Sequence, residues 1–159
     1  MAHIPDLAIC GYLPASDGLS FLAVGWLEPD QDFPRGIMAE DFFLRLCSLL
    51  RDPWQPPVAC CGVHRCGLCR FSGGTGQSSF KDFRFDGIGR GFLFVPRGEQ
   101  LFVSPSNIAH YVDAHAYCPP AEFREAVMNC PDMRSTDYMR ALLATPARDW
   151  LRKLRERAV

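Results

Sequence analysis

Two cysteines near the middle of the chain have the spacing of a metal-binding knuckle. Cys66-Gly67-Leu68-Cys69 is a CxxC motif with a glycine between the sulfurs. This spacing lets two thiolates point at one ion while nearby backbone amides help to hold them. A thioredoxin-like redox pair would stand at the start of a helix after a strand, whereas the residues downstream here are FSGGTG. The pattern therefore favours metal binding over redox chemistry.

Two histidines further along the chain have the spacing of the second half of such a site. His110 and His115 form an HxxxxH pair, within the spacing that zinc-finger histidines use. At roughly 100° per residue they lie about 140° apart around a helix, so we expect His115 where the helix ends or tightens. The alternative is two ordinary histidines on a helix surface. Because a CxxC precedes them, we predict a tetrahedral Zn²⁺ site with Cys66, Cys69, His110 and His115 as its ligands.

Other histidines and cysteines compete for this assignment. His64 lies two residues before Cys66, and ligands so close together would strain a knuckle that already has its CxxC, so we expect His64 beside the site or on the surface. Cys61 lies five residues before Cys66 and is also within reach, and whether either residue joins or replaces a ligand stays open. The remaining isolated thiols are expected to be small buried hydrophobic residues, namely Cys10, Cys47 and Cys130.

The ligands require a helix and a hairpin to bring them together. GFLFV and QLFV, joined by PRGE, predict a β-hairpin. Ser104-Pro105 is a good N-cap and N1 pair for a following helix through IAHYVDAHA. Pro119 and Pro120 are expected to end this helix. A knuckle, a hairpin and a helix carrying two histidines follow the order of a ββα zinc finger with a long insertion. Residues 71–90 are rich in Gly and Ser and are expected to form that inserted loop or an irregular hairpin.

The rest of the chain predicts one α+β domain. Residues 20–27 are apolar and predict a short strand, and MAEDFFLRLCSLLRD has helical spacing with acidic residues in its first turn. Short helices are predicted towards the C-terminal end over about 121–128, from Ser135 or Thr136 to Leu143, and over 146–158, where Thr145-Pro146 repeats the signal of a capping residue followed by proline. With no internal repeat and no linker, we expect residues 1–159 to form a single domain with a small antiparallel sheet or hairpin, a ββα-like zinc site and several short helices.

Composition limits the class of protein. The chain has 159 residues, 48% of them hydrophobic and 12% aromatic, which is typical of a packed globular core. A formal net charge of -1 predicts no general attraction to nucleic acid or anionic lipid. No apolar stretch reaches the roughly 18 residues of a membrane span, and the first residues lack the basic-then-apolar pattern of a secretory signal. We therefore expect a cytoplasmic protein in which metal binding or buried thiols, and not disulfides, explain eight cysteines.

Three segments resemble a family of uncharacterised small bacterial proteins. They are VGWL…DFPRG, HRCGLCRF and NIAHYVDAHAYCPPAEFREAV. The family pattern runs VGWL…PFPxG, then FHxCxLC, then LIxHYxxxHxYxPPxxF, and the resemblance covers most of residues 1–143. It implies that Cys66, Cys69, His110 and His115 occupy the family's metal positions, and it implies no activity. The chain differs by having Val63 where phenylalanine is usual and by its expanded 71–90 segment.

Four protein ligands would fill the coordination sphere, which is typical of structural zinc, whereas catalytic zinc keeps a position for water. The chain has no HExxH, GxSxG, P-loop or GxGxxG motif, and it lacks the signature of the zinc deaminases. Asp113 could act as a base if one histidine were not a ligand; a solvated carboxylate or one that orients an imidazole is the simpler interpretation. We therefore expect a non-enzymatic protein and keep a zinc-dependent hydrolase as an alternative.

The final helix offers a second clue to function. It carries a local net charge of +3, from Arg148, Arg152, Lys153, Arg155 and Arg157 against Asp149 and Glu156. Trp150, Leu151 and Leu154 form a narrow apolar stripe that could dock on the body or on a partner. A basic helix beside a zinc knuckle makes a nucleic-acid-binding protein an alternative. The slightly negative net charge and abundant aromatic residues instead favour a protein partner, as for an adaptor, immunity-type or regulatory module.

Overall fold

Two antiparallel strands form the centre of the fold in the computed structural model, which describes residues 3–14, 16–57, 66–69 and 91–157 and the backbone of 78–80 and 83–85. Strand β4 (Phe92–Arg97) pairs with β5 (Gln100–Pro105) over its whole length. Gly98, the first of the two loop residues, has a φ of 57°, which glycine adopts without steric cost. The predicted hairpin is therefore confirmed.

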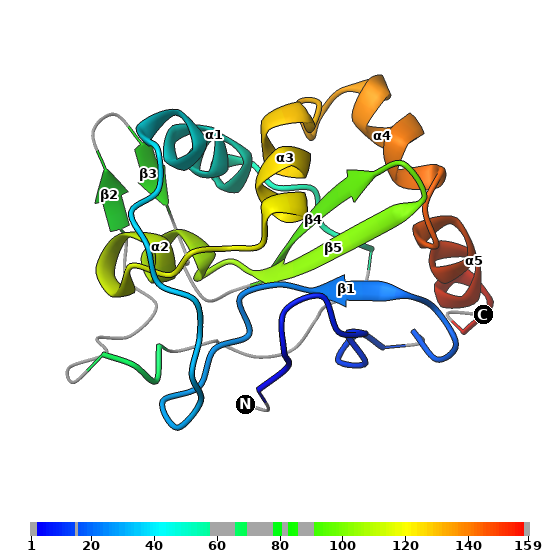
Figure 1. The fold of residues 1–159 in the computed structure, drawn as a ribbon. Helices are drawn as coiled ribbons and strands as arrows, with labels where there is room; N and C mark the ends of the chain where they lie inside the picture. The colour runs from blue at the N-terminus through cyan, green and yellow to red at the C-terminus, as the bar shows by residue number, and fades with distance from the viewer. Residues whose placement is uncertain are drawn as a thin grey trace.

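A third strand, β1 (Phe21–Ala23), lies beside β5, so the sheet order is β1-β5-β4 (Figure 1). This strand falls within the segment predicted from residues 20–27. It pairs in parallel with β5, which makes the sheet mixed. A parallel neighbour needs a long crossover connection, and α1 (Glu40–Arg51) lies in the one that joins β1 to the hairpin. The predicted α+β class with a small sheet is confirmed.

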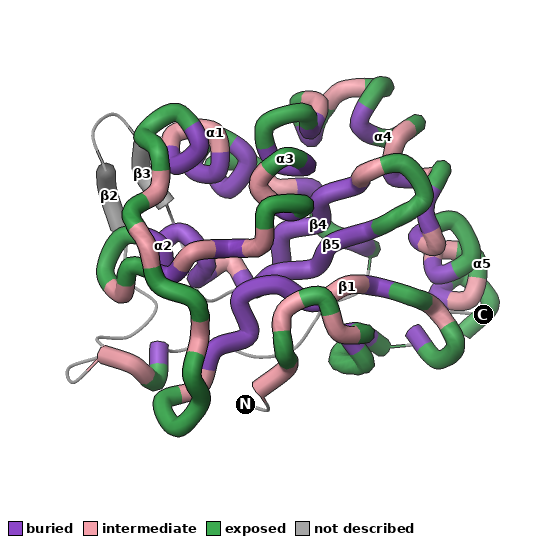
Figure 2. The backbone as a smooth tube through the Cα atoms, in the orientation of Figure 1, coloured by how far each residue is buried: buried purple, intermediate pink, exposed green. Residues whose placement is uncertain are grey.

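The hairpin is buried because helices pack around it (Figure 2). All of β4 except its last residue and all of β5 except its first are buried. Helices α3 (Ala121–Asn129) and α4 (Thr136–Leu143) both contact β4. Phe123 of α3 packs edge-on against Phe102 with ring centroids 5.7 Å apart, and the Tyr138 hydroxyl of α4 donates a hydrogen bond to the Phe94 carbonyl at 2.9 Å.

The last two helices begin where their capping residues predict. The Ser135 hydroxyl accepts a hydrogen bond from the Tyr138 amide at 3.0 Å at the start of α4. The Thr145 hydroxyl accepts one from the Ala147 amide at 3.2 Å, and α5 (Ala147–Arg157) follows. Each side chain satisfies an amide at the open N-terminus of its helix. The two cap predictions are confirmed.

Helix α5 packs on the body of the protein through its apolar stripe. Trp150 is fully buried between Phe21 and Phe94, at ring-centroid distances of 5.4 and 5.6 Å. Its indole N–H donates to the Pro14 carbonyl at 2.7 Å, and Leu154 is also buried. The stripe therefore stabilises the domain, and the arginines of this helix lie on its outer side.

The predicted start of the histidine helix is wrong. Ser104 and Pro105 complete β5 opposite Leu93 and Phe92, and α2 (Ile108–His115) begins three residues after Pro105. Cross-strand pairing satisfies this stretch of backbone and overrides its local preference for a helix start. Proline is compatible with the end of a strand because it needs no amide partner there.

Within residues 71–90, strands β2 (Ser78–Phe80) and β3 (Phe83–Phe85) form a second, antiparallel pair, with β3 close to α1. This agrees with the irregular hairpin that was one of two predictions for the segment, and the rest of the segment lies outside the described residues.

None of the helices in the described ranges combines the length and apolarity that a membrane crossing requires.

Candidate metal centre

The four predicted ligands lie together. The ligand atoms of Cys66, Cys69, His110 and His115 are all within 4.8 Å of one another. The Cys69 sulfur lies 3.2 Å from His110 Nε2 and 3.4 Å from His115 Nε2, and the Cys66 sulfur lies 3.3 Å from His115 Nε2. Both imidazoles therefore turn the same nitrogen towards the sulfurs. In the described ranges this is the one group of three or more Cys, His, Asp or Glu side chains that could hold a metal ion.

Helix α2 brings its two histidines together by ending at the second one. His115 is the last residue of α2, and Ala116 adopts the left-handed conformation with a φ of 53°. The amides of Ala116 and Tyr117 both turn back to the Tyr111 carbonyl. The imidazoles consequently meet edge to face, with ring centroids 5.1 Å apart and an interplanar angle of 83°. The expectation that His115 lies where the helix ends is confirmed.

A loop far away in the sequence supports this end of the helix. The Arg35 guanidinium donates to the His115 carbonyl at 3.1 Å, and the Gly36 amide donates to the Ala116 carbonyl at 2.8 Å. The Cys118 amide donates in turn to the Pro34 carbonyl at 2.9 Å. Residues 34–36 thus hold the carboxyl end of α2 in place. This role was not predicted, although the DFPRG motif that contains these residues was noted in the sequence.

The cysteine knuckle rests on the loop after β1. A methyl group added at Gly67 would lie 3.2 Å from Cγ and Cδ of Pro29. Any residue larger than glycine at this position would therefore require Pro29 to shift. Backbone amides of Leu68 and Cys69 interact with the Cys66 sulfur and lower its pKa, as expected for a knuckle. Burial has the larger and opposite effect, so the pKa of the Cys66 thiol is raised overall.

The two histidines are suited to bind a cation as neutral ligands. Burial lowers the pKa of His110, although the Asp113 carboxylate opposes this change. Burial also lowers the pKa of His115, and the neighbouring His110 and Arg35 lower it further. A depressed pKa keeps each imidazole uncharged at neutral pH, and the neutral form has the lone pair that a metal needs.

Two competing candidates fall outside the described residues. His64 and Cys61 belong to that part of the chain, so their relation to the site stays open.

Cys10, Cys47 and Cys130 are 0, 0 and 3% exposed, which confirms them as buried residues. Burial raises the pKa of Cys47 and of Cys130 to about 12, so both stay protonated and inert at neutral pH.

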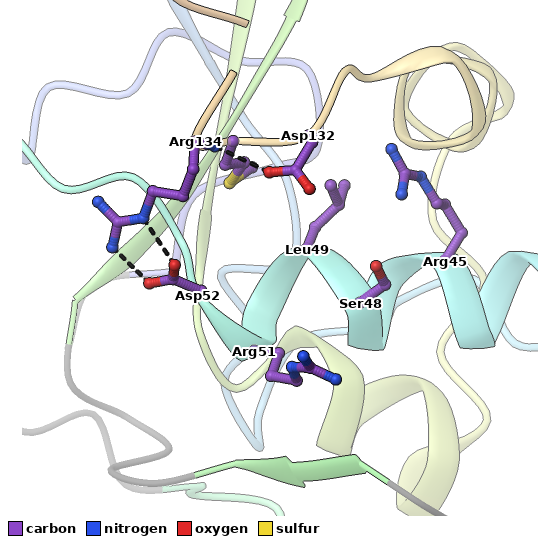
Figure 3. A pocket seen from close by; sticks show the side chains of 8 residues that line it. Arg45, Ser48, Leu49, Arg51, Asp52, Asp132 and Arg134 are labelled. Atoms are coloured by element: carbon purple, nitrogen blue, oxygen red, sulfur yellow. Dashed lines mark hydrogen bonds and ion pairs between the residues drawn. The ribbon is translucent and has the colours of Figure 1, made fainter.

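A hollow of about 310 Å³, away from the Cys/His cluster, is lined by three arginines but has its own counter-charges (Figure 3). Arg134 is turned towards Asp52 and pairs with both carboxylate oxygens, which lowers the pKa of Asp52. Arg45 donates to the Cys130 carbonyl, and the Asp132 carboxylate accepts from the Arg134 amide at 2.9 Å. Arg134 and Arg45 therefore have internal partners, and the three arginines do not converge on a common point (Figure 3).

An α+β domain with two cysteines and two histidines that could hold a metal ion is the class that this fold and site define. The chain belongs to the family described as Domain of unknown function (DUF7919), which matches residues 2–128. No curated protein and no solved structure matches the chain. The match includes all four candidate ligands and ends within α3, whereas α4 and α5 follow it and pack into the same core.

Proposed function

We propose that this protein is a zinc-stabilised, non-enzymatic domain that binds another protein. One observation carries the zinc-stabilised part of the proposal, namely that four protein side chains converge on one point from two elements far apart in the sequence. Two thiolates and two imidazoles are a common ligand set of structural zinc. Borderline-soft ligands of this kind in a tetrahedral arrangement favour zinc over magnesium, calcium or manganese.

The distances support a tetrahedral ion. With zinc–sulfur bonds of about 2.3 Å and zinc–nitrogen bonds of about 2.05 Å, neighbouring sulfur and nitrogen ligands lie about 3.6 Å apart. The three sulfur–nitrogen distances are 3.2 to 3.4 Å, so a small outward movement of the side chains would accommodate the ion. Free thiols at this site and elsewhere suit a reducing compartment such as the cytoplasm.

A closed set of protein ligands favours binding over catalysis. A hydrolytic zinc needs a coordination position for water and a nearby base. Asp113 is exposed and close enough to affect the pKa of His110, so it would be the base if one ligand were replaced by water. With all four ligands engaged, that position is filled, and the zinc would hold α2, the knuckle and the 34–36 loop in one arrangement.

Metal analysis joined to X-ray absorption spectroscopy tests this proposal. We expect one zinc per chain with two sulfur and two nitrogen ligands in the wild type, and loss of zinc in Cys69→Ser. Cys47→Ser is the matched control because Cys47 is a buried cysteine outside the cluster. A stoichiometry near zero under reducing conditions would contradict the zinc site. Three protein ligands plus water would instead favour the hydrolase.

A further inference from the structure

A groove of about 410 Å³ lies between α2 and the segment that leads into α1. Its volume is in the range of sites that accept a small ligand or a few side chains of a peptide. We call it the α1–α2 groove, and it is lined by Gly36, Ile37, Met38, Glu40, Phe43, Val112, Asp113 and Ala116. The groove begins immediately beyond the residues that support His115, so it adjoins the metal centre.

The inner side of the groove is apolar, and one lip exposes an unusual side chain. Phe43 of α1 and Val112 of α2 are 8 and 7% exposed, and Met38 is half-buried. Ile37 is 99% exposed, more than any other large hydrophobic residue in the described ranges. Scattered exposed hydrophobic residues are normal on a protein surface. Ile37 shares the groove lining with Met38, Phe43 and Val112, and a contiguous apolar surface rimmed by polar residues is typical of a contact surface for a partner.

The charges around the groove are acidic. Glu40 and Asp113 line it from opposite walls, and Asp41 follows in the first turn of α1. The described residues that line the groove include no lysine or arginine, and the neighbouring Arg35 has its guanidinium 4.2 Å from the Phe33 ring centroid and donates to the His115 carbonyl. Arg35 is therefore already engaged. Asp113 is exposed on the α2 wall, and an apolar groove beside such a carboxylate is complementary to an apolar side chain with a basic neighbour.

We propose that the α1–α2 groove binds a short segment of a partner protein that places one apolar side chain against Phe43 and Val112 and a lysine or arginine beside Asp113. The proposal rests on the proposed protein-binding function and specifies the site and the chemistry of the partner. The groove depends on the metal centre because Val112 and Asp113 lie between the two histidine ligands on α2. Its other wall continues from residues 34–36, which bind the end of that helix.

A heptapeptide library displayed on phage, selected on the zinc-loaded full chain, tests the proposal. We expect enriched peptides to contain an apolar residue next to lysine or arginine. The most enriched sequence is then synthesised with a fluorescent label and titrated by anisotropy. Ile37→Asp and Asp113→Lys should each weaken binding at least tenfold, which is about 1.4 kcal/mol. Zinc content is measured for each variant, so a lost groove is distinguished from a lost metal.

Two matched variants control for the introduced charge. Ile9→Asp changes an isoleucine that is 61% exposed on another segment, and Glu156→Lys reverses an exposed acid on α5. Both should bind the peptide within twofold of the wild type. Binding that the Ile37 and Asp113 variants leave unchanged would overturn the groove as the site while leaving a protein-binding function intact.

Two other outcomes would also overturn the assignment. A wild-type dimer in analytical ultracentrifugation that Ile37→Asp converts to a monomer would show that the groove receives a second copy of this chain. A selection that enriches no peptide would contradict the protein-binding function itself, and the groove proposal with it. Zinc content is measured independently of peptide binding on the same samples. The failure of the zinc site, of the protein-binding function and of the groove assignment can therefore be recognised separately.

Discussion

Free zinc should stabilise this protein by an amount that depends on the number of sites. The described residues contain one Cys/His group that could hold a metal. For one site that binds only the folded state, each tenfold rise in free zinc well above the dissociation constant adds about 1.4 kcal/mol to the free energy of unfolding. The predicted dependence of the free energy of unfolding on zinc concentration therefore follows from the presence of a single cluster.

The same slope can be expressed as a melting temperature. At roughly 2.1 cal/mol/K per residue, the unfolding entropy of a 159-residue chain is about 0.33 kcal/mol/K. A stabilisation of about 1.4 kcal/mol then raises Tm by about 4 °C for each tenfold rise in free zinc. Thermal unfolding followed by far-ultraviolet circular dichroism in metal-buffered solutions, under reducing conditions, measures this slope.

Two variants separate the site from the rest of the protein. Cys69→Ser removes the sulfur that lies next to both histidines, so its Tm should no longer depend on zinc in the same concentration range. Cys47→Ser changes a buried thiol outside the cluster and should keep the wild-type slope at a lower Tm. A wild-type Tm that ignores zinc, or an equal slope in Cys69→Ser, would refute the reasoning.

Three further predictions concern packing, pH and the knuckle. Trp150→Ala should lower the free energy of unfolding by about 3–5 kcal/mol in urea titrations, because the indole is fully buried; a change below about 1 kcal/mol would mean that α5 is not part of the core. Gly67→Ala should weaken zinc binding about fivefold or more in competition with a chelator, whereas Gly11→Ala, with nothing within 4 Å of the added methyl, should not. Stability should fall as pH rises above about 9, because burial raises the folded-state pKa of the Cys47 and Cys130 thiols and of three tyrosines, so the unfolded chain loses these protons first; a urea midpoint that is constant from about pH 8 to pH 11 would contradict this. These tyrosines are Tyr111, Tyr117 and Tyr138.

Local patterns in the sequence predicted the helices and the ligands well. The apolar spacing of α1 and the caps at Ser135 and Thr145 depend on neighbouring residues, and the structure has these helices where the patterns placed them. The CxxC and HxxxxH spacings likewise predicted which four side chains would meet. The start of α2 was wrong because pairing with β4, a non-local interaction, holds Ser104 and Pro105 in a strand.

The sequence by itself determined which four Cys and His side chains could form a site and the type of most elements, because both depend on spacing along a short stretch of chain. Tertiary structure alone decided what surrounds the site. Arg35 and Gly36 reach the end of α2 across about eighty residues of sequence, and Pro29 lies against the knuckle, since the packing of the loops after β1 brings them there. The α1–α2 groove has the same origin. Its walls come from two helices far apart in the chain, so no local pattern could reveal it.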